Sequence, residues 1–212
     1  MRVIPLHRES DVDYSCVSYW VLGDQNAISD RNTLIDTGSK SAENSVFFFR
    51  EMASMSKGIG KMAVEQVILT HEHYDHSGGL TVIDRQFAPA VYSWLPAGTK
   101  HMAVYDGMHV RVGDQDGIIL HTPGHSDDSI CVYLPLVRTL FSGDSVFRIT
   151  DDQGSYSQAY LETLRRLSAL EVVAIYPGHG LPILKNAVTF IGECADFVSK
   201  SLFRNQGGLE PR

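Results

Sequence analysis

The segment from Thr70 to Gly79 places three histidines and an aspartate within six residues: His71, His73, Asp75 and His76. In an extended chain, side chains at positions i and i+2 point the same way, so His71 and His73 can bind one ion together. Asp75 and His76 follow where the chain turns, which allows them to face a neighbouring ion. Imidazole and carboxylate ligands suit zinc, iron or manganese rather than calcium. The segment therefore predicts a transition-metal site.

Three more residues of ligand type stand in similar surroundings further along the chain. His125, Asp144 and His179 each follow an apolar run and each stand beside a glycine. Such positions are typical of loops at the edge of a sheet, where functional side chains are held by a rigid scaffold. We expect the three residues to join the metal site.

Short apolar runs separated by turn residues would form the scaffold that positions these ligands. Alternation and turn residues predict strands at 17–22, 33–35, 63–69, 91–94, 129–134, 139–142 and 172–176, and a hairpin of 110–112 with 118–120. Helical spacing predicts helices at 43–55, 80–87, 156–170 and 185–203. The order of elements favours a sheet-rich core with helices packed outside it.

The overall composition is that of a folded domain. The chain has 212 residues, of which 43% are hydrophobic and 20% charged, and a formal net charge of −7. We expect a single domain over 1–212, with a loose tail at 205–212. The acidic balance argues against nucleic acid as a partner. No signal-peptide core and no membrane-length apolar run are present, so we expect a cytoplasmic protein whose three separated cysteines are buried and reduced.

The motifs taken together resemble a known family. His-x-His-x-Asp-His at 71–76 is followed by Pro-Gly-His at 123–125, Gly-Asp at 143–144 and Gly-His at 178–179, and Leu-Ile-Asp-Thr-Gly stands earlier at 34–38. This series, from Tyr14 to Pro182, resembles the metallo-β-lactamase superfamily. It is most similar to the branch with hydroxyacylglutathione hydrolase (glyoxalase II) and its short relatives. The resemblance implies an α/β fold, the αβ/βα sandwich of two mixed β-sheets flanked by helices.

The resemblance also implies how the ligands are shared. Two divalent metal ions are expected, zinc first, with iron or manganese also compatible. The ligands to the first ion would be His71, His73 and His125, and those to the second Asp75, His76 and His179. Asp144 would bridge the two ions, and Asp36 would support the ligands from behind.

The implied activity is hydrolysis of a small ester, thioester or lactone by a hydroxide shared between the two metals. Asp75 would also act in catalysis by orienting that hydroxide. Tyr74, Arg148 and Tyr156 are candidates for the substrate pocket, and 149–157 for a lid. A small-molecule substrate is the expected partner, and a homodimer formed through apolar surface is compatible with the sequence.

Two other interpretations stay open at this stage. A single-iron oxidoreductase similar to persulfide dioxygenases shares much of the motif set, and its iron would take His71, His125 and Asp144. A non-catalytic domain of the same fold is the third interpretation, but the chain retains all seven ligand positions, whereas degenerate members lose some.

Overall fold

The computed structural model describes residues 1–7, 13–25, 27–55, 61–95, 101–149 and 154–205. Two predictions fall partly outside these ranges. Positions 150–153 of the predicted lid and positions 206–212 of the predicted tail are not among the described residues.

The first β-sheet has six strands in the order β1-β2-β3-β4-β5-β6. Its strands are β1 (Arg2–Leu6), β2 (Ser18–Leu22), β3 (Thr33–Ile35), β4 (Gln66–Ile68), β5 (Ala90–Ser93) and β6 (His101–Ala103). The β1–β2 and β2–β3 pairs are antiparallel, whereas β3 to β6 pair in parallel, so the sheet is mixed.

The second β-sheet has five strands in the order β11-β10-β9-β8-β7. Its strands are β7 (His109–Val112), β8 (Gln115–His121), β9 (Ile130–Leu134), β10 (Thr139–Gly143) and β11 (Ala174–Pro177). Only the β10–β11 pair is parallel, so this sheet is mixed as well.

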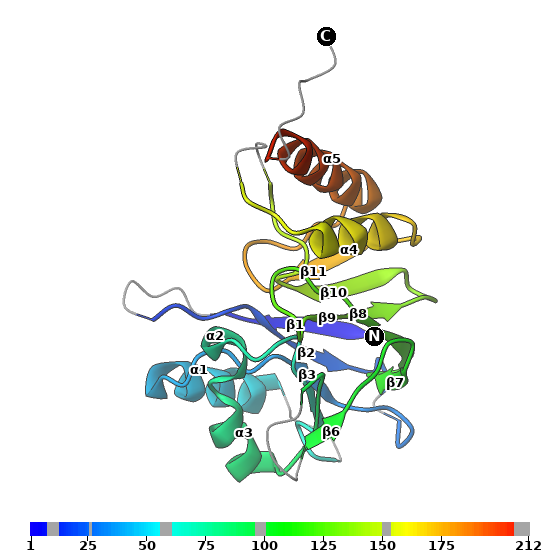
Figure 1. Cartoon of the computed structure of the whole chain (residues 1–212). Coiled ribbons are helices and arrows are strands. Elements are labelled where there is room, and N and C mark those ends of the chain that lie inside the picture. Colours follow the sequence, from blue (N-terminus) through cyan, green and yellow to red (C-terminus); the bar gives the residue numbers. More distant parts are fainter. Residues whose placement is uncertain (8–12, 26, 56–60, 96–100, 150–153, 206–212) are drawn as a thin grey trace.

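Helices cover the outer face of each sheet, which gives four layers (Figure 1). On the first sheet lie α1 (Ala42–Met55), α2 (Tyr74–Ser77) and α3 (Leu80–Phe87). On the second lie α4 (Gln158–Ser168) and α5 (Ala187–Asn205). The predicted αβ/βα sandwich is confirmed. Among the described helices, none is both long and apolar enough to cross a membrane.

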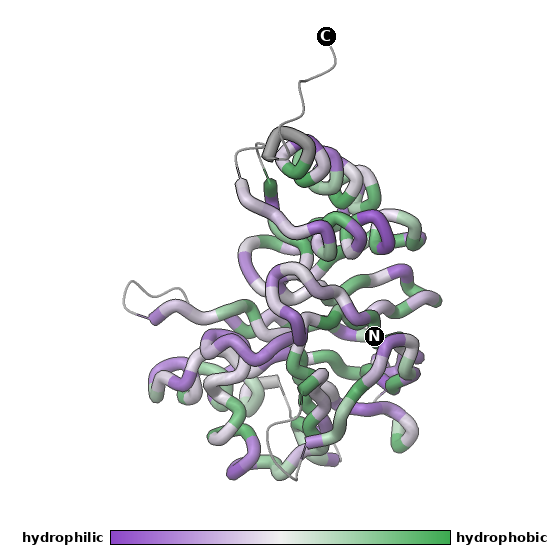
Figure 2. Tube along the Cα trace, in the orientation of Figure 1, coloured by the Kyte–Doolittle hydropathy of each residue, from purple (hydrophilic) through white to green (hydrophobic). Residues whose placement is uncertain are grey.

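Alternation along the strands assigns side chains to separate core layers, because successive residues point to opposite faces of a sheet. In β2, Tyr19 and Val21 pack between the two sheets, whereas Trp20 and Leu22 pack under the helices of the first sheet. In β10, Phe141 packs between the sheets and Leu140 packs against α4 and α5. Strands buried on both faces carry continuous apolar runs, whose hydrophobic residues are coloured green in Figure 2.

One predicted loop and two edge strands differ between the sequence analysis and the structure, each for a physical reason. The expected loop at 113–117 is a shorter turn, because Val112 pairs with Gln115 and Gly113 takes a φ of 56°. β1 was not predicted: it contains Pro5 and lies at the sheet edge, where proline is tolerated. β6 was not predicted either, because it is a three-residue edge strand without alternation.

Candidate metal centre

The ligand-bearing loops meet at one edge of the sandwich, where backbone hydrogen bonds join them. The Val17 N–H donates to the Gly178 carbonyl (2.7 Å), and the Gly178 N–H donates to the Gly143 carbonyl (2.8 Å). The Ile130 N–H donates to the Thr70 carbonyl (2.8 Å), which links the first sheet to the second. These bonds bring together loops that lie far apart in the sequence, 161 positions apart for Val17 and Gly178.

The first donor group consists of three imidazoles. His71 Nε2 lies 2.9 Å from His73 Nδ1, and the same His73 nitrogen lies 3.0 Å from His125 Nε2. His71 follows β4, and His125 lies in the loop between β8 and β9. The extended backbone at His73 (φ −61°, ψ 148°) places its side chain beside that of His71, as the i, i+2 spacing predicted.

The second donor group contains Asp75, His76 and His179. Asp75 and His76 are buried in the single turn of α2, and His179 follows β11. Asp75 Oδ2 lies 3.1 Å from His179 Nε2 and 3.6 Å from His76 Nε2. One donor atom from each of the three residues lies within 4.8 Å of the others.

Asp144 stands between the two groups. Its Oδ1 lies 3.3 Å from His76 Nε2, and its Oδ2 lies 3.5 Å from His125 Nε2 and 3.6 Å from His179 Nε2. One carboxylate therefore faces both donor groups. The structure brings all seven sequence-predicted ligands into one cluster.

Asp36 orients His76 from behind. Its Oδ1 accepts a hydrogen bond from the Thr70 backbone N–H (2.7 Å), and its Oδ2 accepts one from the Thr70 hydroxyl (2.8 Å). The same Oδ2 lies 2.8 Å from His76 Nδ1. In the neutral imidazole, a proton held on Nδ1 by this carboxylate leaves Nε2 as the lone-pair nitrogen, which is the tautomer that a metal requires.

The charges in the cluster depend on its burial and its carboxylates. Burial and the neighbouring His76 lower the pKa of His71 to about 4, so His71 is a neutral imidazole at pH 7. Burial opposes ionisation of Asp144, but His76, His179 and His71 outweigh it and lower its pKa to about 2. Burial also opposes the charged form of His76, but the charge of Asp36 and the approach of Asp144 raise its pKa above the ordinary value. The site thus places the ionised carboxylate of Asp144 near the neutral imidazole of His71, a combination that favours a bound cation.

One atom tests directly whether the residues fit a metal. His76 Nε2 is buried, faces the cluster and has no hydrogen bond of acceptable geometry among the described residues. An unsatisfied buried nitrogen is costly unless a ligand completes it. Together with the converging donors around it, this nitrogen fits a divalent cation.

Gly178 is needed because the ligands pack against its α-carbon. A β-carbon at this position would collide with Asp144 Oδ1 and with His76 Cε1. This contact explains why a glycine precedes His179. The sequence showed the glycine but not what it touches.

We expect Gly178→Ala to displace both ligands and to destabilise the protein by about 1–3 kcal/mol, the usual cost of overpacking. Ions per chain should fall with it, as measured by elemental analysis. Gly192→Ala in α5 is the matched control: a β-carbon there meets nothing within 4 Å, so stability should be unchanged or rise by about 0.5–1 kcal/mol. Equal metal content in both variants would contradict this role for Gly178.

A pocket of about 310 Å³ opens beside the cluster. Its lining combines ligands with apolar side chains: Tyr14, His125, Gly143, Asp144, Val146, Phe147 and His179. Tyr14, Val146 and Phe147 were missed by the sequence reasoning, because no motif marks them and they meet only in the fold. Val146 and Phe147 stand two and three positions after Asp144, and this closeness in sequence was the one available signal.

The three predicted pocket residues are not in this lining. Tyr74 lies in α2 with 62% of its surface exposed. The Arg148 guanidinium lies 5.4 Å from the centre of the Phe190 ring in α5. Tyr156 packs against Tyr160, with ring centres 5.9 Å apart. That these three residues contact the substrate remains a prediction.

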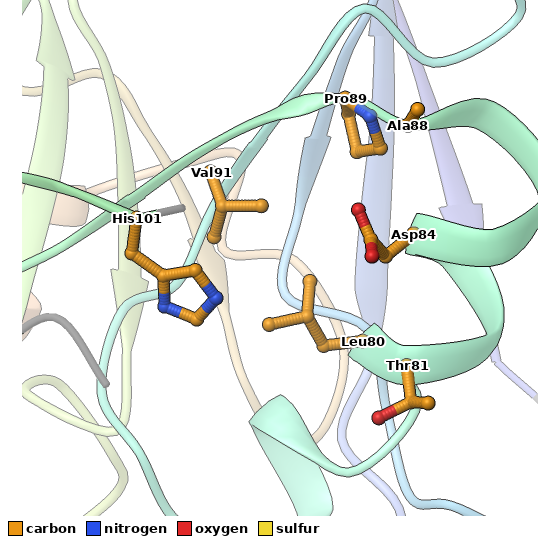
Figure 3. Close-up of a pocket in the computed structure, with 7 residues that line it drawn as sticks. All are labelled: Leu80, Thr81, Asp84, Ala88, Pro89, Val91 and His101. Atoms are coloured by element: carbon orange, nitrogen blue, oxygen red, sulfur yellow. The ribbon is translucent and has the colours of Figure 1, made fainter. Parts of the chain in front are cut away.

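A second pocket, of about 410 Å³, lies between α3 and strands β5 and β6. Figure 3 shows the side chains of Leu80, Val91 and His101 facing one another across it, with Asp84 on the helix side. None of the seven clustered ligands lines this pocket, so the chemistry of the cluster belongs to the first pocket.

Comparison with known proteins agrees with the geometry. The family model of the metallo-beta-lactamase superfamily matches residues 13–98 and 103–179, which confirms the resemblance inferred from the motifs. A hydroxyacylglutathione hydrolase from Hydrogenovibrio crunogenus is 30% identical over 84% of this chain and 63% of its own length. An atrochrysone carboxyl ACP thioesterase from Aspergillus fumigatus is 29% identical over 83% of this chain.

The chain spans only 44% of the length of that thioesterase. Among solved structures, ETHE1 from Myxococcus xanthus superposes with a TM-score of 0.69 at 23% identity. The match covers 100% of this chain and 93% of that one, and it shows the fold.

Proposed function

Because this chain belongs to the metallo-β-lactamase superfamily, we propose that it is a metal-dependent hydrolase of small thioesters, esters or lactones. The observation that carries the proposal is the pair of donor groups joined by Asp144. We propose two divalent cations, zinc first and iron or manganese as substitutes. One would be held by His71, His73 and His125, and the other by Asp75, His76 and His179.

When bound, such cations supply a nucleophile from water at neutral pH and polarise the carbonyl of the substrate. The chain's own residues would position the reactants. Asp144 faces both donor groups and would fix their spacing. Asp75 Oδ2 is buried beside the pocket ligand His179 and would accept a hydrogen bond from the attacking water, which orients it toward the carbonyl carbon.

The pocket lining supports an apolar acyl group as the part of the substrate that is bound. Val146 and Phe147 follow the bridging Asp144 by two and three positions, and Tyr14 lines the same space. The two relatives are a thioesterase and a hydroxyacylglutathione hydrolase, and both of these names describe cleavage of a thioester. Thioesters of medium-length acyl chains are therefore our first substrate class. Water adds to the carbonyl carbon, the carbon–sulfur bond breaks, and a carboxylic acid and a thiol leave.

The proposal is tested with the purified full chain, first stripped with a chelator and then loaded with zinc, manganese or iron. We expect no hydrolysis of a hexanoyl thioester by the stripped protein and full recovery at two ions per chain. Free thiol release measures turnover, and elemental analysis measures occupancy. Activity that is unchanged after complete metal removal would exclude the proposed mechanism.

A second candidate function rests on another grouping in the same cluster. His71, His76 and Asp144 offer three donor atoms within 4.8 Å, the two-histidine, one-carboxylate set of non-haem iron sites. This set is compatible with the single-iron oxidoreductase considered from the sequence, for which persulfides were the expected substrates and His125 was expected as a ligand in place of His76. Oxygen uptake with glutathione persulfide by protein that carries one iron per chain would favour it; no uptake would reject it.

A further inference from the structure

Tyr14 lies in a short segment that is tied to the metal loops by its backbone. The Cys16 N–H donates to the Asp75 carbonyl (3.1 Å), and the Val17 N–H donates to the Gly178 carbonyl (2.7 Å). Both acceptors belong to loops that carry ligands. The position of Tyr14 is therefore coupled to the metal site, although it precedes the nearest ligand by more than 50 positions in the sequence.

The Tyr14 ring lies flat on a ligand. Its centre is 4.8 Å from that of the His179 imidazole, with 16° between the two planes. The phenol oxygen lies 3.4 Å from His179 Nε2, the nitrogen that also faces Asp75 and Asp144. The ring contact holds the side chain, while 62% of its surface stays exposed toward the pocket and solvent.

The Tyr14 hydroxyl would be available to hydrogen-bond to a substrate when a cation occupies the lone pair of His179. Among the described residues, His179 Nε2 is its one hydrogen-bond partner. A cation held by His179 would remove that acceptor, and the stacked ring would keep the hydroxyl beside the pocket. A phenol is a good donor to an oxygen that gains negative charge.

We infer that Tyr14 is a further catalytic residue, whose hydroxyl donates a hydrogen bond to the carbonyl oxygen of the scissile bond. This inference rests on the proposed hydrolase function. The bond strengthens as the carbonyl oxygen becomes an oxyanion, so it stabilises the transition state more than the bound substrate. No proton is transferred, and the phenol is unchanged at the end of the reaction.

The test compares Tyr14→Phe, which removes only the hydroxyl, with Tyr14→Ala, which also removes the stacked ring. The matched control is Tyr105→Phe, because Tyr105 is 64% exposed and does not line the pocket. For Tyr14→Phe with the hexanoyl thioester we expect kcat to fall about a hundredfold, the usual effect of losing one oxyanion donor, with KM little changed. Tyr14→Ala should also raise KM, and ions per chain should match the wild type in all variants.

A second readout does not depend on turnover. Calorimetric binding of hexanoate to the zinc-loaded protein should weaken about tenfold in Tyr14→Phe, because the carboxylate loses one donor. Wild-type kcat and hexanoate affinity in Tyr14→Phe would overturn the inference and leave Tyr14 as a wall of the pocket. Loss of metal in Tyr14→Phe would also overturn the inference, because it would mean that the hydroxyl acts by holding the metal ligand His179 in place. If the wild type cleaves no thioester, ester or lactone, the proposed function fails, and hexanoate binding still decides whether Tyr14 donates to the ligand.

Discussion

Asp144→Asn is expected to lower kcat/KM for thioester hydrolysis about a thousandfold, equivalent to about 4 kcal/mol of transition-state stabilisation. The carboxylate presents one oxygen to His76 and the other to His125 and His179. An asparagine of the same shape has one oxygen and one NH₂ group, so it lacks the negative charge and one of the two oxygens that face the donor groups. Elemental analysis should find the variant with fewer ions per chain than the wild type.

The control for Asp144 is a surface carboxylate. The Asp116 side chain is 82% exposed and bonds only Arg111 among the described residues, so Asp116→Asn should keep full metal content and activity. Circular dichroism and thermal unfolding of both variants separate loss of the site from loss of the fold. An Asp144→Asn protein that binds two ions and hydrolyses at the wild-type rate would contradict the bridging role.

The clustering of the candidate ligands could be predicted from the sequence because the signals are local. His71 and His73 share one direction by the two-residue period of extended chain, and each later ligand stands beside a glycine that ends an apolar run. The fold then brings these loops together, as the structure shows. Local spacing cannot, however, measure distances between loops. The sharing of ligands between two ions came from the family resemblance and remains a proposal.

Long-range contacts explain what the sequence did not reveal. Tyr14 and His179 are 165 positions apart, and their rings meet because Val17, just before β2, is hydrogen-bonded to Gly178, just after β11. The position of the hairpin turn at Gly113 depends on the pairing register of β7 and β8. The apolar runs in the sequence define that register only to within a few residues. Arg148 was placed in the pocket by its position in the sequence, but its guanidinium packs on Phe190.

Asp36→Asn is expected to weaken binding of the ion next to His76 by about ten- to a hundredfold, the usual effect of losing a partner behind a metal ligand. The Asp36 Oδ1 position accepts the Thr70 backbone N–H, so the oxygen of an asparagine must stay there. Its NH₂ group then faces His76 Nδ1 and donates to it. That hydrogen bond moves the imidazole proton to Nε2, which is the atom required for the metal.

Asp30→Asn is the matched control, because Asp30 is 3% exposed against 2% for Asp36 and accepts the Ala27 N–H away from the site. Both variants should lose some stability, since each alters a buried, hydrogen-bonded carboxylate. Only Asp36→Asn should lose metal affinity, which a zinc titration against a competing chelator measures. If the two variants lose affinity equally, the effect comes from general destabilisation, and the tautomer argument for His76 is wrong. A selective loss would mean that the carboxylate of Asp36 sets which nitrogen of His76 reaches the metal.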